Sequence, residues 1–205
     1  MPTTDINKII SNLKKFCTLD DKVILCVGAG GGQFVVYGRD ARKVIAIDSD
    51  PEALKILETR VEEEGLKEKF EIILKDFGKC NIHADLVIFE FSLHEMRNPC
   101  AAIRRALTLA PEVVIMDHWK SSSWAFLIDE YDKITRSWNA VETFIVKNLK
   151  VYDSMQNFAD YDQLNRKIES QGETAIERAK DYKNRKNFTI PFSYAFALIA
   201  KSDNQ

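Results

Sequence analysis

Three glycines at alternate positions follow a short apolar run, in a stretch that reads VGAGGGQF over residues 27–34. Gly28, Gly30 and Gly32 fit the order G-x-G-x-G. Glycine has no Cβ, so the backbone here can turn sharply and come close to a ligand. A dinucleotide-binding turn would need glycine where Gln33 stands, and a phosphate-binding loop would need a following lysine that is absent. The spacing therefore predicts close backbone approach to a different ligand.

Acidic residues end the apolar runs that follow. Asp48 lies 20 positions after Gly28, the interval that places a carboxylate at the tip of the adjacent strand. Such a carboxylate can accept both hydrogen bonds from a ribose diol. Asp76 and Glu90 end the third and fourth runs. Each of these could be a solvated strand cap by itself, but the glycines followed by Asp48 and Asp76 in this order favour a binding site.

Histidines follow the fourth and fifth apolar runs. His94, with Glu95 beside it, lies in SLHEM, and His118 ends the fifth run. Either could act as a base or orient a substrate, and the alternative is a loop or helix-cap hydrogen bond. Metal binding by Glu90, His94 and His118 is conceivable from residue type alone. Because their spacing gives no independent support, and no CxxC or HExxH pattern is present, no metal site is predicted.

These residues need strands and helices in alternation to position them. Five apolar runs separated by helical patterns occupy the first 119 residues, which predicts an α/β fold with a doubly wound, mostly parallel sheet and helices on both faces. Residues 4–17 predict an amphipathic covering helix. The segment from Ser121 to about Asn148 is helical in period and rich in aromatic residues, and FTIPFSYAFALIAK predicts a final strand.

Three of these stretches carry a resemblance to a known family. VILCVGAGGGQF, VIAIDSDPEAL and ILKDFG resemble the first three motifs of class I S-adenosylmethionine-dependent methyltransferases. ADLVIFEFSLHEM is similar to the stretch after the fourth strand in members that act on small molecules. The resemblance covers roughly residues 20–120 and implies a Rossmann-like, seven-stranded fold with S-adenosyl-L-methionine as cofactor. The implied cofactor-binding residues are Gly28, Ala29, Gly30, Gly32, Asp48, Ser49, Asp76, Phe77 and Glu90, and His94 is the candidate catalytic residue.

The resemblance also implies roles for these positions. The glycine turn would approach the methionine part of the cofactor, and Asp48 would hold the ribose hydroxyls. Asp76 would accept from the adenine amino group, with the Phe77 backbone beside it, and Glu90 would face the methionine end. One departure concerns affinity for the cofactor, because Cys26 stands where the family usually has an acidic residue. A second, APE in place of a glycine pair before the fifth strand, is expected to alter only a turn.

Some acceptor chemistries are disfavoured. An N-P-P-Y type tetrad is absent at EFSL, which argues against transfer to amide or adenine nitrogen. Cys100 lies several residues beyond the fourth strand, beside Pro99 at an expected helix start, and is interpreted as structural. We therefore expect methyl transfer to a small-molecule acceptor. Two alternatives stay open: an RNA or protein methyltransferase that docks through the basic segment 177–188, and a non-catalytic S-adenosylmethionine-binding protein.

Composition limits the partners. With Lys+Arg 29 against Asp+Glu 31, the chain has no overall basic footprint, so nucleic acid is not expected as a partner. No apolar run is long enough to span a bilayer and the N-terminus does not resemble a signal peptide, so a cytoplasmic protein with reduced cysteines is expected. The oligomeric state is left open. One domain over 1–205 is predicted, divided into a covering helix (1–18), a cofactor-binding core (19–120), a helical lid (121–172) and C-terminal strands (173–205).

Overall fold

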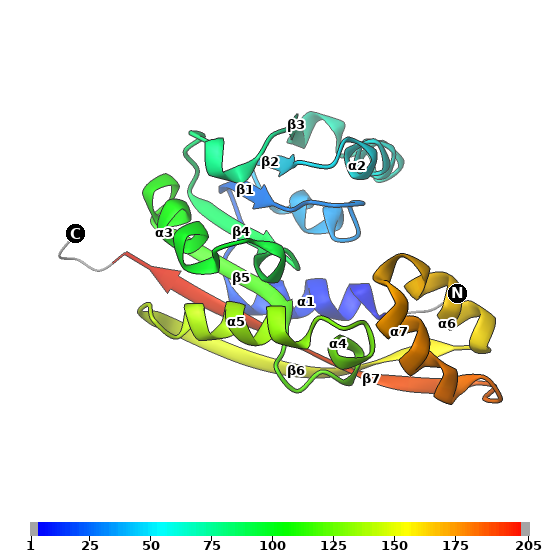
Figure 1. The fold of residues 1–205 in the computed structure, drawn as a ribbon. Helices are drawn as coiled ribbons and strands as arrows, with labels where there is room; N and C mark the ends of the chain where they lie inside the picture. The colour runs from blue at the N-terminus through cyan, green and yellow to red at the C-terminus, as the bar shows by residue number, and fades with distance from the viewer. Residues whose placement is uncertain (1–3, 202–205) are drawn as a thin grey trace.

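The computed structural model describes residues 4–201, which form a seven-stranded sheet in the order β3-β2-β1-β4-β5-β7-β6 (Figure 1). Strands β1 to β5 are parallel, and β7 is antiparallel to both of its neighbours. The expected doubly wound, mostly parallel sheet is confirmed. The strands are β1 (Val23–Val27), β2 (Lys43–Asp48), β3 (Phe70–Leu74), β4 (Leu86–Glu90), β5 (Glu112–His118), β6 (Val146–Phe158) and β7 (Phe188–Ala200).

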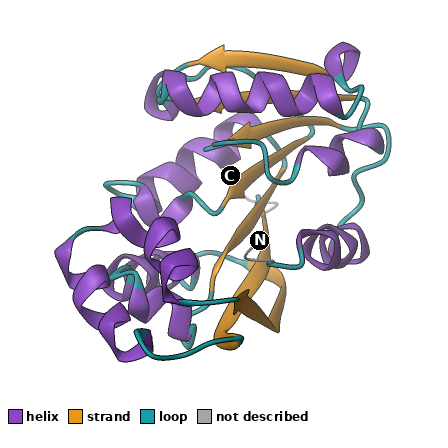
Figure 2. Cartoon of the chain, turned by 90° about the vertical axis from the view of Figure 1, so that its right-hand side faces the viewer, coloured by secondary structure: helices purple, strands orange, loops and turns teal. Residues whose placement is uncertain are grey.

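Helices cover both faces of the sheet (Figure 2). One buried cluster joins α1, α2, α4, α6 and α7 to one face, and a second joins α3 and α5 to the other. The α-helices are α1 (Ile6–Phe16), α2 (Pro51–Glu63), α3 (Pro99–Leu109), α4 (Ser123–Leu127), α5 (Tyr131–Val141), α6 (Tyr161–Ile168) and α7 (Glu173–Ala179). The 3-10 helices are η1 (Val35–Arg39), η2 (Lys67–Lys69), η3 (Phe77–Lys79), η4 (Leu93–Glu95), η5 (Glu169–Gln171) and η6 (Lys180–Tyr182).

The continuous apolar runs of the central strands follow from this double covering. In β1, Ile24 and Cys26 belong to one buried cluster, whereas Leu25 and Val27 belong to the other. Successive side chains in a strand point to opposite faces, so a strand covered on both faces needs apolar residues at every position. Among the described residues, no helix combines the length and the apolar character that crossing a bilayer requires.

The segment expected to be a helical lid is different from the prediction. Instead of one long helix, α4 and α5 are separated by a turn in which Asp129 has φ 62°, and residues 146–158 form strand β6. Strand β6 lies at the sheet edge and most of its residues are exposed or half-buried, so it lacks the apolar density that marked the other strands. The region expected to hold only C-terminal strands begins instead with α7 and η6, and contributes the single strand β7.

Candidate functional site

The glycine turn follows β1 and is fixed by β2. The Gly28 and Ala29 amides donate to the Ile47 carbonyl over 3.0 and 3.3 Å. Gly28 has φ 69°, and a Cβ added there would lie 2.2 Å from the Cβ of Ser92. Gly32 has φ 68°, and a Cβ there would lie 2.8 Å from a Leu57 methyl carbon. Two of the three glycines are thus required by the protein's own packing as well as by backbone conformation.

Asp48 ties the turn to the end of β2. Its carboxylate accepts from the Gly30 amide over 2.9 Å and from the Asp50 amide over 3.0 Å. Asp76 is exposed after β3, and its carboxylate accepts from the Gly78 amide over 2.6 Å. A cavity of about 360 Å³ is lined by the four residues predicted for the adenosine part of the cofactor, Asp48, Ser49, Asp76 and Phe77. The structure therefore brings these four residues together.

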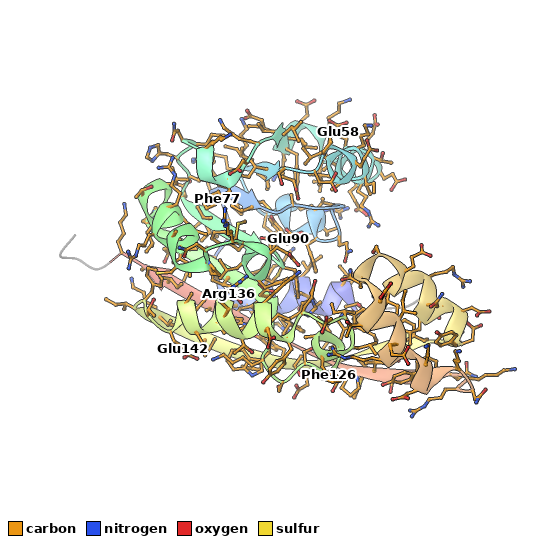
Figure 3. All side chains as sticks on the ribbon, in the orientation of Figure 1. Glu58, Phe77, Glu90, Phe126, Arg136 and Glu142 are labelled. Carbon is orange, nitrogen blue, oxygen red and sulfur yellow. The ribbon has the colours of Figure 1, made fainter. Side chains whose placement is uncertain are left out.

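Glu90 at the end of β4 faces Cys26 at the end of β1. Val27 pairs with Phe89, so Glu90 lies beside the start of the glycine turn. The Cys26 thiol donates to Glu90 Oε2 over 3.2 Å. Glu90 is only 8% exposed, and Figure 3 places it in the interior, between the upper strands and α5. Burial raises the pKa of Glu90 to about 8, although hydrogen bonds from Cys26 and Tyr37 act in the opposite direction.

Three carboxylates surround the imidazole of His94, which is 3% exposed. Asp117 Oδ1 lies 2.6 Å from Nδ1, and Asp117 Oδ2 accepts from the His94 amide over 3.1 Å. On the other side of the ring, Nε2 lies 3.4 Å from Glu95 Oε1 and 3.3 Å from Glu130 Oε2. Burial by itself would lower the pKa of His94, but Asp117, Glu130 and Glu95 outweigh it and raise the pKa to about 12. Lys133 lies on the outer side, 3.0 Å from Glu95 and 3.8 Å from Glu130.

His118 lies beside this cluster in a more apolar setting. Its ring centroid is 5.8 Å from that of His94 and contacts Phe91 and Phe192 edge-on at 5.0 and 5.3 Å. Its Nδ1 is buried and has no hydrogen-bond partner within residues 4–201. Burial lowers the pKa of His118 to about 4, even though the nearby Asp117 carboxylate acts to raise it. His118 therefore presents a neutral ring.

A second cavity, of about 380 Å³, joins these groups to the glycine turn. Its wall includes Glu90, His94 and His118, together with Lys167 from α6. The two cavities adjoin at the glycine turn, because both are lined by Gly28, Phe91 and Glu95. Of the predicted residues, the larger cavity is lined by Gly28, Ala29, Gly30, Glu90 and His94, whereas Gly32 lines neither cavity.

Several site residues were missed from the sequence. Asp117 precedes His118 in β5, and a charged residue near the end of an apolar run was the one signal that could have indicated it. Glu130 lies where one unbroken helix was expected. Lys167 donates to Gln156 over 2.6 Å and lies 5.0 Å above the Trp124 ring, contacts that no local pattern indicates.

Phe91, on the walls of both cavities, was missed as well. Its φ is 49°, a conformation that a bulky residue rarely adopts, so its residue type gives no signal of the turn at this position. Its ring stacks on Phe34 with centroids 5.5 Å apart, and its amide donates to the Met116 carbonyl over 2.7 Å. Tertiary packing therefore holds this backbone in place. Strained backbone of this kind is frequent at ligand-binding sites.

Comparison with known proteins agrees with this fold. Residues 25–110 match the methyltransferase domain family. A Bacillus halodurans protein assigned as a methyltransferase is 15% identical, with a TM-score of 0.67 over 97% of this chain and 99% of its own. Magnesium protoporphyrin IX methyltransferase from Synechocystis PCC 6803, a structure with bound SAH, is 10% identical, with a TM-score of 0.59 over 96% of this chain and 81% of its own. A Pyrococcus horikoshii protein assigned as an RNA methyltransferase is 16% identical, with a TM-score of 0.56 over 96% and 81%. No curated protein matches the sequence.

The structure is an open α/β domain with two adjoining cavities at the carboxyl ends of its parallel strands, the place where such domains bind ligands. The match of residues 25–110 to the methyltransferase domain family, together with this fold, supports a class I S-adenosylmethionine-dependent methyltransferase. The same domain match supports an enzyme that uses S-adenosylmethionine as its cofactor.

Proposed function

We propose that the chain transfers the methyl group of S-adenosylmethionine to a small-molecule acceptor bound in the larger cavity. The observation that carries the proposal is the composition of the cavity wall. Among the described residues that line it, Lys167 is the one lysine or arginine, beside Glu90, Glu95 and Glu130. Nucleic-acid backbones bind through clustered lysine and arginine, which this wall does not offer.

The basic segment 177–188, which could have served as a docking surface for RNA, is partly neutralised. Arg178 pairs with Asp129 over 3.1 Å, and Lys180 pairs with Glu177. These pairs reduce the positive charge that the segment offers to a phosphate backbone. They therefore favour the small-molecule acceptor over RNA.

The cofactor would lie across both cavities. Asp48 and Asp76 suit the ribose and adenine groups, and the turn from Gly28 to Gly30 suits the methionine part. Glu90 is proposed to pair with the methionine ammonium, because a buried carboxyl with a raised pKa gains most from a neighbouring cation. Cys26 in β1 occupies the position where an acidic residue is expected. Glu90, from the adjacent strand β4, would then supply the missing carboxylate.

When bound, S-adenosylmethionine supplies a methyl group on a positively charged sulfur, which departs as a neutral thioether. The chain has to align the acceptor, exclude water and accept a proton where the acceptor carries one. His118 suits the proton-accepting role, because Nδ1 has no partner within the described part of the chain. Both ring nitrogens of His94 already face carboxylates, so we assign this residue to orienting the acceptor.

Transfer of a radioactive methyl group tests the acceptor class. The protein would be incubated with methyl-labelled S-adenosylmethionine and, separately, with the low-molecular-weight filtrate, the RNA fraction and the protein fraction of a cell extract. We expect label in the filtrate, and no transfer by the Asp48→Ala variant. Label confined to RNA or protein would overturn the small-molecule assignment.

A further inference from the structure

His94 and two glutamates form a group of potential metal ligands on the wall of the larger cavity. One atom from each of His94, Glu95 and Glu130 lies within 4.8 Å of the other two. Two of the separations are 3.4 Å (Nε2 to Glu95) and 3.3 Å (Nε2 to Glu130). Ligands about 2.0–2.2 Å from one ion stand roughly 3–3.5 Å apart in tetrahedral or octahedral geometry. The two separations from Nε2 therefore match the spacing of ligands around one metal ion.

The support behind His94 is that of a metal-binding histidine. Asp117, which is fully buried, holds Nδ1 at 2.6 Å and the backbone amide at 3.1 Å. A metal-bound histidine commonly directs its second ring nitrogen to a carboxylate, which fixes the ring orientation. With Asp117 on Nδ1, Nε2 is left as the nitrogen directed at Glu95 and Glu130.

A second feature of the cavity also indicates a ligand. The buried Nδ1 of His118 has no hydrogen-bond partner within residues 4–201, and its ring lies 5.8 Å from that of His94 on the same cavity wall. An unpaired polar atom in a buried position is costly unless a ligand satisfies it. The two histidines thus line one cavity, and the Nδ1 atom of His118 there would need a ligand to satisfy its hydrogen bonding.

We propose that His94, Glu95 and Glu130 bind one divalent first-row transition metal ion, such as Zn²⁺ or Mn²⁺, with Asp117 as the outer support of His94. One imidazole with two carboxylates suits these ions, whereas Mg²⁺ and Ca²⁺ prefer oxygen ligands alone. Three protein ligands would leave at least one coordination position open, and all three residues line the larger cavity. The further role of this position, to hold an acceptor oxygen, rests on the proposed function; metal binding itself does not.

Zn²⁺ titration of the chelator-treated protein, followed by calorimetry, tests the site. We expect one Zn²⁺ per chain. Glu130→Gln should weaken binding by about tenfold or more, and Asp117→Asn by about 10- to 100-fold. Glu142→Gln is the matched control, because Glu130 and Glu142 cap opposite ends of α5 and Figure 3 shows Glu142 at the periphery. Lys133→Met removes a competing cation and should strengthen binding.

Thermal unfolding and S-adenosylmethionine titration, both without metal, check that each variant is folded. Absence of Zn²⁺ binding to the wild type, or equal affinity in wild type and folded Glu130→Gln, would overturn the metal site. Zn²⁺ binding that weakens in Glu130→Gln, in a chain that does not bind S-adenosylmethionine, would retain the metal site and remove the proposed function. Binding of S-adenosylmethionine without binding of Zn²⁺ would remove the metal site alone.

Discussion

Among single residues, the pair Cys26 and Glu90 distinguishes this site. The acidic group expected before the glycine turn is absent from β1, but a carboxyl from the neighbouring strand reaches the same place and accepts from the Cys26 thiol. The exchange leaves a buried carboxyl without a cationic partner among the described residues. Its raised pKa is the physical sign of that condition.

The pH dependence of stability should reveal the cost of ionising Glu90. Its pKa rises from 4.5 unfolded to about 8 folded, so between these values the folded chain retains a proton that the unfolded chain has lost. The free energy of unfolding therefore falls as pH rises through this window. The Glu90→Gln variant should not show this fall. At pH 7 its free energy of unfolding should be higher than that of the wild type by about 3 kcal/mol, and near pH 4 the two should differ little.

Urea unfolding of both proteins across this pH range measures the effect. Glu58→Gln is the control, because Glu58 is exposed on α2, at the upper edge of the molecule in Figure 3, and lines neither cavity. The same pH dependence in Glu90→Gln as in the wild type would contradict the expectation.

Glu90→Gln should weaken cofactor binding, although it raises the stability of the fold at pH 7. Loss of the Glu90 charge is expected to weaken S-adenosylmethionine binding about 10- to 100-fold, the usual value of a hydrogen bond to a charged group. Methylthioadenosine lacks the amino-acid part, so its affinity should not change. Asp48→Ala should weaken the binding of both ligands. Calorimetric titration separates these cases, and equal losses for the two ligands in Glu90→Gln would show that Glu90 does not contact the methionine end.

Among the elements, hydrogen bonds between the loops that follow the strands and their neighbouring elements fix the shape of the site. Ser92, just after β4, donates to the Val27 carbonyl over 2.7 Å and packs against the Gly28 backbone. Arg136 on α5 donates to the His94 and Met96 carbonyls over 3.5 and 3.4 Å, which holds the η4 loop against the helix. The turn and the histidine loop are thus fixed by different elements.

Gly28→Ala tests the tight join between these strand ends. The added methyl would meet Ser92 at 2.2 Å in a backbone with φ 69°, so we expect a loss of about 2–4 kcal/mol in the free energy of unfolding. Gly31→Ala, in the same turn, has ordinary contact at 3.5 Å with Ile56 and should cost less than about 1 kcal/mol. Chemical denaturation compares them. Ser92→Gly should recover part of the loss in the Gly28→Ala background, and equal losses at the two glycines would contradict the steric account.

Across the whole molecule, distant segments meet over the carboxyl ends of the parallel strands. The larger cavity is lined by residues of α1, the glycine turn, α4, α6 and β7. In Figure 1, α6 and α7 lie at the right-hand side together with α4. A ligand that spans these parts should stabilise the folded chain as a unit.

Thermal unfolding should therefore depend on the cofactor. At a concentration of about 100 times the dissociation constant, S-adenosylmethionine should add about 2.7 kcal/mol to the stability. For a chain of this size that corresponds to a rise in Tm of roughly 5–10 °C. A fluorescence melting series over cofactor concentration measures the rise, and the same series on Asp48→Ala is the control. A Tm that does not change with cofactor would be incompatible with the proposed site.

The first half of the fold was predictable from the sequence, and so was the placement of Asp48 and Asp76 at neighbouring strand ends, where both line one cavity. Apolar runs that end in glycine or aspartate are local signals, because a strand buried on both faces imposes its composition residue by residue. Asp48 and Asp76 are local signals as well, because each was recognised by its place at the end of a strand. The edge strand β6 was not predicted, because most of its positions are at least partly exposed and carry no continuous apolar run.

The cluster of carboxylates around His94, in contrast, depends on tertiary packing. Asp117, Glu130 and His94 come from β5, the N-cap of α5 and η4, and no spacing in the chain relates them. Their contacts depend on the packing of α5 against the η4 loop. The carboxyl that accepts from the Cys26 thiol likewise comes from β4, through sheet register. Chain order positions residues that act alone at strand ends, whereas a cluster that converges from three elements exists only once those elements are packed.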